Sequence, residues 1–308
     1  MPQRRGALPI SDTEVLNCPD TYARGVPYDC LDRLRGKTPV VWLDGRFAGE
    51  PGSWAVLRYT DVRRALSRPE LFSPIPLETL HGPVVRGSAH DGMPIDTGGT
   101  AADDGGGAAA GTPIDMDPQA QALLSRIGQE SADLITGVLN EMPETLRNTV
   151  AGGAYALVRH PEQYARLRAG RADETLLDSA VEEMLRWWTP VMQVRRLVRR
   201  STKMGGVPLR TGEQVALWLT AANHDDEVYV QPGRFLPERF VSGSERHLSF
   251  GHGARVCLGG HLARVHLRAM ILAILDRPGR LELAGEPVRL RSTARHGFEH
   301  LPVRWAPE

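Results

Sequence analysis

The sequence predicts a mainly α-helical fold with small β-sheets, formed by a single domain over residues 1–308. The central and C-terminal parts contain long segments whose apolar residues recur at helical spacing. The segments that read as strands are short and are separated by glycine-rich turns. Hydrophobic residues make up 41% of the chain and charged residues 24%, which is the balance of a globular protein with a sizeable core.

The first ordered part of the chain is predicted to be strand, turn, strand and helix over residues 38–73. An apolar run at Val40–Trp42 predicts the first strand, and turn-forming residues fill 45–52. Asp61 is expected to be the N-cap of the helix, because its side chain can accept from unpaired amides there. Pro69 ends this helix.

Residues 81–116 are expected to form a flexible insert rich in glycine and alanine. The stretch TGGTAADDGGGAAAG within it contains no bulky apolar residue and therefore cannot contribute to a packed core.

Three helices are predicted in the centre of the chain, at 131–160, at 161–169 and from Asp173 to shortly before Pro190. Apolar residues recur at helical spacing through the first of them. Pro143 lies inside this first helix and must remove one of its backbone hydrogen bonds.

The last third is predicted to begin with short strands over 191–220, joined by the turns MGGV and RTGE. The meander QPGRFLPERF follows, rich in proline, glycine and phenylalanine. A final helix is expected over 261–275, and the tail reads as strand.

Net charge, cysteine content and the length of the apolar segments limit which classes of protein are possible. The formal net charge is +0, so no overall field favours nucleic acid or an anionic membrane. Cys18, Cys30 and Cys257 lie far apart, which argues against a disulfide framework and suits a reducing compartment. No segment approaches the roughly 18 apolar residues of a membrane span, and the N-terminus lacks the apolar run of a signal peptide. We therefore expect a cytoplasmic protein with no nucleic-acid and no membrane partner.

The strongest chemical signal is the segment FGHGARVCLGG at residues 250–260. Its glycines let the backbone turn tightly, and Cys257 stands just before the predicted last helix. Unpaired amides and the helix dipole at that position favour an ionised sulfur. Two alternatives are a buried cysteine that acts as a small hydrophobe and a zinc site with His261 and His266, for which no second cysteine exists nearby.

This segment resembles the haem-ligand loop of the cytochromes P-450, Phe-Gly-x-Gly-x-Arg-x-Cys-x-Gly, at every fixed position. The resemblance implies a cytochrome P-450-like fold, haem b (iron protoporphyrin IX) as cofactor and Cys257 as the thiolate ligand of the iron. It implies that Phe250 shields the sulfur and that Arg255 anchors a haem propionate. The cofactor-binding residues implied within the loop are Phe250, Gly251, Gly253, Arg255 and Gly259.

A second match is Glu183-x-x-Arg186, whose members stand one helical turn apart and can form an ion pair. Such pairs are common on solvated helices. The resemblance adds Arg239 of the segment PERF, which completes a structural triad that holds the meander beneath the haem loop. It also implies that Arg195 binds a propionate, the alternative being an exposed basic residue among other arginines.

The resemblance assigns Glu144 and Thr145 to the acid and alcohol pair that relays protons to bound dioxygen in this family. Met142 stands where the family has a glycine that leaves room for oxygen. Pro143 enforces the local helix opening that the family uses there. The alternative for Thr145 is a hydroxyl that bonds back to its own helix backbone.

The resemblance covers the front of the chain and everything from about residue 131 to 305, but the chain is about a quarter shorter than a bacterial member would be. The shortening follows PIDMDPQAQALL, between the N-terminal helices and the long central helix. The implied function is a haem-thiolate monooxygenase that inserts one oxygen atom from O2 into a small apolar substrate, with electrons from a ferredoxin-type donor and its reductase. The alternatives are a catalytically impaired or non-catalytic homologue that acts as a partner-binding helper, and a truncated product that folds poorly.

Overall fold

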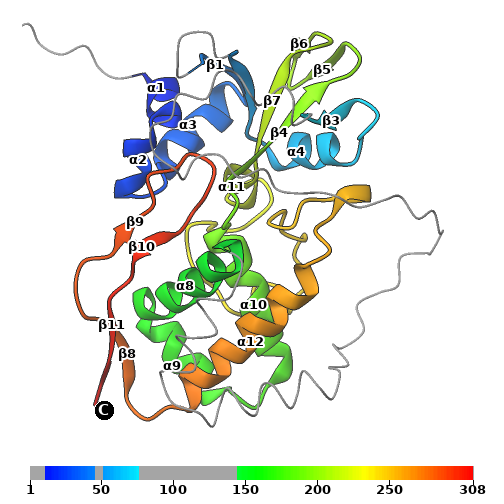
Figure 1. Ribbon diagram of the computed structural model, residues 1–308. Coiled ribbons are helices and arrows are strands. Elements are labelled where there is room, and N and C mark those ends of the chain that lie inside the picture. The colour runs from blue at the N-terminus through cyan, green and yellow to red at the C-terminus, as the bar shows by residue number, and fades with distance from the viewer. Residues whose placement is uncertain (1–10, 46–50, 76–143, 308) are drawn as a thin grey trace, which may run out of the picture.

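Figure 1 shows the computed structural model, which describes residues 11–45, 51–75 and 144–307. The predictions for the insert at 81–116, for the first part (131–143) of the helix at 131–160, and for Met142 and Pro143 within it lie outside the described residues.

Three short helices begin the described chain, α1 (Asp12–Asn17), α2 (Pro19–Arg24) and α3 (Tyr28–Lys37). A capping box starts α1, because the Ser11 hydroxyl accepts from the Glu14 amide at 3.2 Å and the Glu14 carboxylate accepts from the Ser11 amide at 2.8 Å. Leu16 and Leu31 are completely buried and pack in one cluster with Trp218 of the sheet. These helices therefore cover one face of the main sheet.

The main sheet has five strands in the order β1 (Val40–Leu43), β2 (Ser53–Val56), β7 (Gln214–Trp218), β4 (Gln193–Val198) and β3 (Phe72–Pro74). Only β2 and β7 run parallel, and the other neighbours are antiparallel. The predicted pair of strands before residue 57 is confirmed. The sheet joins strands from residues 40–74 to strands from residues 193–218.

Helix α4 (Tyr59–Leu66) starts earlier than expected, and the prediction of Asp61 as its N-cap is wrong. Arg58 is the N-cap, and its side chain makes no capping hydrogen bond. The Tyr59 amide donates instead to Oδ2 of Asp225 at 2.8 Å, 166 residues later in the chain. The first amide of this helix is thus satisfied by a residue far away in the sequence, where the local pattern predicted a neighbouring side chain as the cap.

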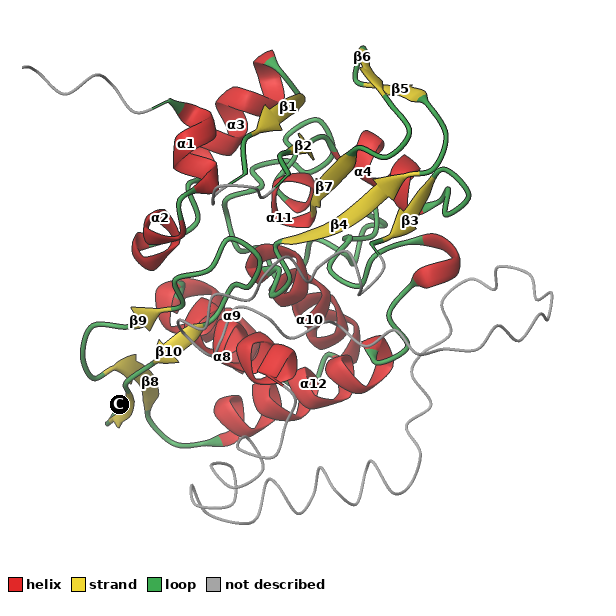
Figure 2. Cartoon of the chain, turned by 45° about the horizontal axis from the view of Figure 1, so that its top comes forward, coloured by secondary structure: helices red, strands yellow, loops and turns green. Residues whose placement is uncertain are grey.

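The helical layer consists of α8 (Glu144–Arg159), α9 (Pro161–Ala169), α10 (Glu174–Trp188), the short α11 (Leu219–Asn223) and α12 (Gly260–Asp276). Figure 2 shows α8, α10 and α12 packed side by side below the sheet. The helix predicted at 161–169 and the last helix are confirmed. Asp173 caps α10 by accepting from the Leu176 amide at 3.1 Å.

Helices α8 and α10 approach each other closely at one glycine. A Cβ atom on Gly152 would lie 2.2 Å from Cγ of Trp188, so only glycine fits beneath this indole. The buried residues of this layer form one cluster that includes Ala156, Leu185 and Ile271.

Three antiparallel pairs complete the described chain, β5 (Thr202–Met204) with β6 (Val207–Leu209), β8 (Arg280–Leu283) with β11 (Val303–Ala306), and β9 (Val288–Arg289) with β10 (Phe298–His300). The predicted class, mainly α with small sheets, is confirmed for the described residues. No described helix is both long and apolar enough to span a bilayer.

Candidate functional site

The loop that carries Cys257 joins the meander to α12 and depends on two glycines. Gly251 and Gly253 both have φ of +77°, a left-handed conformation that favours glycine. A Cβ on Gly253 would also lie 3.1 Å from the carbonyl oxygen of Leu66 at the end of α4. A short 3-10 turn at Gly253–Arg255 follows. These constraints hold the loop against α4.

Cys257 lies three residues before the first residue of α12, with its side chain exposed. Its amide donates to the Phe250 carbonyl at 2.9 Å, and its own carbonyl accepts from the Gly260 amide at 3.2 Å. A Cβ on Gly259, the N-cap, would lie 3.7 Å from the sulfur. The sulfur therefore stands beside the amino end of a 17-residue helix.

The surface around this sulfur is apolar. Val256 is half exposed, and Leu258 has 94% of its surface open to solvent. A leucine exposed to this degree costs hydrophobic free energy unless another surface covers it. The loop thus presents a sulfur ligand together with a small apolar face.

Phe250 lies behind the loop and belongs to a set of contacts that sequence reasoning missed. The Arg264 guanidinium lies 4.7 Å from the Phe250 ring centre, and it also donates to Glu182 of α10 at 2.9 Å. Nε2 of His247 lies 3.2 Å from the same carboxylate. Burial opposes ionisation of Glu182, but the hydrogen bonds from Arg264 and the nearby His247 ring outweigh it and hold the pKa of this carboxyl well below its usual range.

The structure brings Glu183, Arg186 and Arg239 together in the protein interior. Arg186 donates to Glu183 through two nitrogens, at 2.7 and 2.8 Å, and Arg239 donates to the same carboxylate at 3.0 Å. Glu183 and Arg186 are completely buried. Both arginines also donate to the Arg234 carbonyl of the meander. One carboxylate thus connects α10 to the segment that leads into the Cys257 loop.

Asn223 at the end of α11 makes a second buried connection to that segment, which the sequence did not reveal. Its amide nitrogen donates to the Ser249 and Thr189 hydroxyls, both at 2.9 Å, and its oxygen accepts from the Leu248 amide at 2.7 Å. The Ser249 hydroxyl donates to the Leu185 carbonyl at 2.7 Å. The residues directly before Phe250 are therefore fixed to the end of α10.

Two neighbouring arginines of β4 face opposite sides of the main sheet. Arg196 pairs with Val215, whose side chain joins the cluster that contains Leu66 of α4. Arg195 pairs with Ala216, which belongs to the cluster on the other face. Directly paired residues point to the same face, so Arg196 faces the side on which the Cys257 loop packs.

Electrostatics agree with this placement of Arg196. Burial and then the positive charge of Arg255 lower the pKa of the Arg196 guanidinium, which requires the two cations to lie near each other. A region that receives the field of two guanidinium groups favours an anion. The sequence pointed to Arg195 as a propionate ligand, which stays a prediction, and it gave no reason to prefer Arg196.

Glu144 and Thr145 form the first turn of α8. The Glu144 carboxylate forms an ion pair with Arg295 of the C-terminal tail, a partner that the sequence did not indicate. Thr145 is exposed, and its carbonyl accepts from the Thr149 hydroxyl at 2.7 Å. The threonine whose hydroxyl bonds back to its own helix backbone is therefore Thr149.

The residues present fit an iron porphyrin. The Cys257 sulfur is accessible, Val256 and Leu258 offer an apolar face, and the cation pair of Arg196 and Arg255 suits propionates. His266 of the alternative zinc site donates through Nδ1 to the Leu262 carbonyl at 2.7 Å. Within the described parts of the chain, no three His, Cys, Asp or Glu side chains group as metal ligands.

Comparison with known proteins decides the family. The family model described as Cytochrome P450 matches residues 129–278, which include the triad residues Glu183, Arg186 and Arg239 and the whole Cys257 loop. Residues 129–278 of this chain therefore belong to the cytochrome P450 family. Members of this family bind haem b through a cysteine thiolate, in agreement with the fit described above.

Two curated cytochrome P450 relatives are a steroid C26-monooxygenase of Mycolicibacterium smegmatis, 40% identical, and a methyl-branched lipid omega-hydroxylase of Mycobacterium bovis, 36% identical. Each alignment covers 53% of this chain, but it covers 40% of the first relative and 37% of the second. The chain thus matches less than half the length of these relatives.

A solved cytochrome P450-153 from Novosphingobium aromaticivorans shares the fold of this chain. The TM-score is 0.70 at 21% sequence identity, and the superposition covers 94% of this chain and 99% of that structure. A likeness at this identity establishes the P450 fold, with its helical layer and small sheets.

Proposed function

We propose that this chain provides the haem-thiolate site of a monooxygenase that inserts one oxygen atom from O2 into a small apolar substrate. The observation that carries the proposal is the exposed Cys257 sulfur at the amino end of α12, within a loop held by α4 and α10. The two curated relatives named for a steroid and a lipid support an apolar substrate class.

Each residue of the site has a part in this proposal. Cys257 would hold the iron as its thiolate ligand. When bound, the haem supplies oxygen binding and activation. Phe250 and the glycines at 251, 253 and 259 keep the sulfur shielded on one side and accessible on the other. Arg255, with Arg195 or Arg196, anchors the propionates.

Glu144 and Thr145 are proposed to move protons toward the oxygen-binding side. The Glu144 carboxylate can accept and release a proton, and its ion pair with Arg295 fixes its position at the start of α8. The Thr145 hydroxyl is exposed and can donate to a water at that end of the helix. A small ferredoxin-type donor and its reductase are the proposed source of electrons, and the cytoplasm is the proposed location.

The test is a spectrum of the purified chain after haem is supplied. Reduction followed by carbon monoxide should give a Soret band shifted to the red, the signature of thiolate ligation. Cys257→Ser should lose this band, whereas Cys18→Ser, a matched change at another exposed cysteine, should keep it. A wild-type chain that folds but stays colourless would instead favour the partner-binding helper.

Turnover needs a second measurement. With an apolar test substrate, a ferredoxin and its reductase, Thr145→Ala should form less product per O2 consumed, because a proton donor is lost. Thr211→Ala, at an exposed threonine in the turn before β7, should leave this ratio unchanged.

A further inference from the structure

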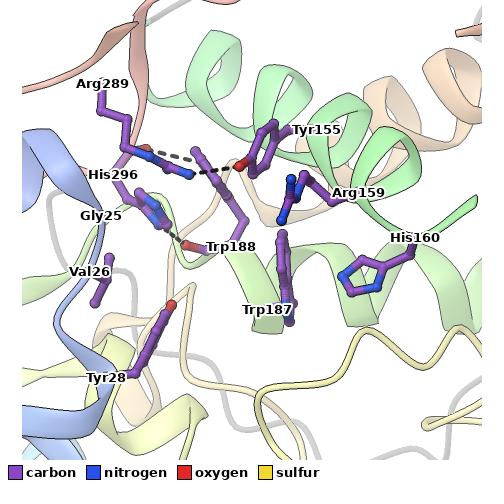
Figure 3. Close-up of a pocket in the computed structure, with 10 residues that line it drawn as sticks. All are labelled: Gly25, Val26, Tyr28, Tyr155, Arg159, His160, Trp187, Trp188, Arg289 and His296. Carbon is purple, nitrogen blue, oxygen red and sulfur yellow. Dashed lines mark hydrogen bonds between the residues drawn. The ribbon is translucent and has the colours of Figure 1, made fainter. Parts of the chain in front are cut away.

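A cavity of about 290 Å³ lies on the part of the molecule where the N-terminal loop meets α8, α10 and the tail (Figure 3). Tyr155 and Arg159 reach it from α8, and Trp187 and Trp188 from the end of α10. The volume is at the lower end of the range for small-molecule sites.

This cavity is separate from the Cys257 site. None of the residues of the Cys257 loop lines it. Tyr155 and Arg159 stand ten and fourteen residues after Thr145 on α8, which at about 1.5 Å per residue places them about 15 and 21 Å further along the helix axis.

The lining of the cavity carries positive charge without a counter-ion. Arg159 and Arg289 are among the lining residues, and no aspartate or glutamate is. In the described chain, neither arginine takes part in an ion pair with a carboxylate. Such an arrangement favours an anionic ligand.

The field of these arginines reaches the other polar groups of the cavity. Burial and, more weakly, the charge of Arg289 bring the pKa of His296 down to about 3, although its hydrogen bond to the Trp188 carbonyl opposes this. Burial lowers the pKa of His160, the Glu162 carboxylate 3.7 Å from its Nδ1 opposes this, and the charge of Arg159 adds to the lowering. Both imidazoles are therefore neutral at pH 7, and the cationic character comes from the arginines.

Arg289 is held in place before any ligand arrives. One of its terminal nitrogens donates to the Tyr155 hydroxyl at 3.0 Å. Its guanidinium lies 5.0 Å from the Tyr155 ring centre and 5.1 Å from that of Phe298. Among the described residues no other acceptor takes its remaining N–H groups, so they are available to a ligand.

The cavity also offers one flat aromatic surface and one unsatisfied polar atom. The Trp187 ring lines the cavity beside Arg159 (Figure 3), whereas the Trp188 ring is already covered by His296, stacked at 3.6 Å, and by Phe298 at 5.0 Å. Nε2 of His160 is buried and has no hydrogen-bond partner in the described structure. A buried polar atom without a partner costs free energy that a ligand can recover.

We propose that this cavity binds a small aromatic carboxylate. The carboxylate would accept from Arg289 and Arg159, whose planar forks match its two oxygens. The aromatic part would lie against the Trp187 ring, with His160 as an additional hydrogen-bonding group. This site goes beyond the proposed monooxygenase function and does not depend on haem.

The probe for the test is 2-naphthoate, titrated into the full chain and followed by tryptophan fluorescence and calorimetry. Arg159→Gln and Arg289→Gln should each weaken binding about tenfold or more, because each removes a charge-assisted hydrogen bond. Arg291→Gln is the matched control, since Arg291 lies in the same tail, pairs with Asp20 and does not line the cavity. The Arg291→Gln variant should bind 2-naphthoate with the affinity of the wild type.

Several outcomes would overturn the proposal. One is that the neutral 2-naphthamide binds as tightly as 2-naphthoate, and another is that inorganic phosphate alone competes as well as 2-naphthoate. A third is an unchanged affinity for 2-naphthoate in the Arg159→Gln variant, which should fold because Arg159 is exposed. Cys257→Ser should keep the affinity for 2-naphthoate. Loss of binding in that variant would place the probe in the Cys257 site and would also contradict the assignment.

Discussion

Arg239 donates through Nε to Oε2 of Glu183 at 3.0 Å, across 56 residues of sequence. The same carboxylate receives two nitrogens of Arg186 from its own helix. A single buried anion therefore joins α10 to the meander that leads to Cys257, and the position of the loop depends on it.

Replacing this anion should strongly destabilise the fold. Glu183→Gln leaves two buried guanidinium groups without a negative partner, and we expect a loss of about 3–5 kcal/mol in the free energy of unfolding. Glu174→Gln changes a carboxylate that is 82% exposed on the same helix and should cost less than about 1 kcal/mol. Denaturant unfolding of both variants checks this, and equal losses would show that the triad is not a stabilising connection.

Two glycines in helices should respond to alanine in opposite ways. Gly152→Ala forces a methyl group against the Trp188 indole and should cost about 1–3 kcal/mol. Gly36→Ala adds a methyl where no atom lies within 4 Å, so helix propensity should stabilise the chain by up to about 1 kcal/mol. Thermal melting compares them. A neutral Gly152→Ala would mean that α8 and α10 are further apart than described.

His296 should make stability depend on pH. Burial is the main reason that its folded pKa is about 3, whereas the unfolded value is about 6.5. The unfolded chain binds the proton more readily, so this contribution is fully present above pH 6.5 and is lost as pH falls toward 3, by up to about 1.4 kcal/mol per pH unit.

Unfolding measured between pH 7 and 5 should therefore show stability falling with acid. His296→Gln should reduce this slope. His224, which is also buried and has a lowered pKa, should account for part of what remains. If the substituted chain keeps the wild-type slope, the buried His296 is not neutral in the folded protein.

The two neighbouring arginines of β4 should differ in their effect on haem. Arg196→Gln should weaken haem retention about tenfold, because Arg196 shares the side of the sheet on which Arg255 and the Cys257 loop lie. Arg195→Gln should have the smaller effect. Haem titration followed at the Soret band measures both, and a larger loss in Arg195→Gln would support the choice made from sequence.

Much of the fold follows from local sequence alone. The helices predicted at 161–169 and 261–275 match the observed Pro161–Ala169 and Gly260–Asp276 almost to the residue. The ten-residue loop around Cys257 indicated the family and its cofactor from the sequence alone, because tight turns and a sulfur ligand leave few residue choices.

The contacts between residues far apart in the sequence were decided by the tertiary structure. Asp225 caps α4 in place of Asp61, Arg295 pairs with Glu144, and Asn223 fixes the residues before Phe250. The cavity beside Arg289 also draws its walls from four separate parts of the chain. Local patterns report which face of an element is buried, but the partner of a buried polar group depends on chain packing, which no short stretch of sequence contains.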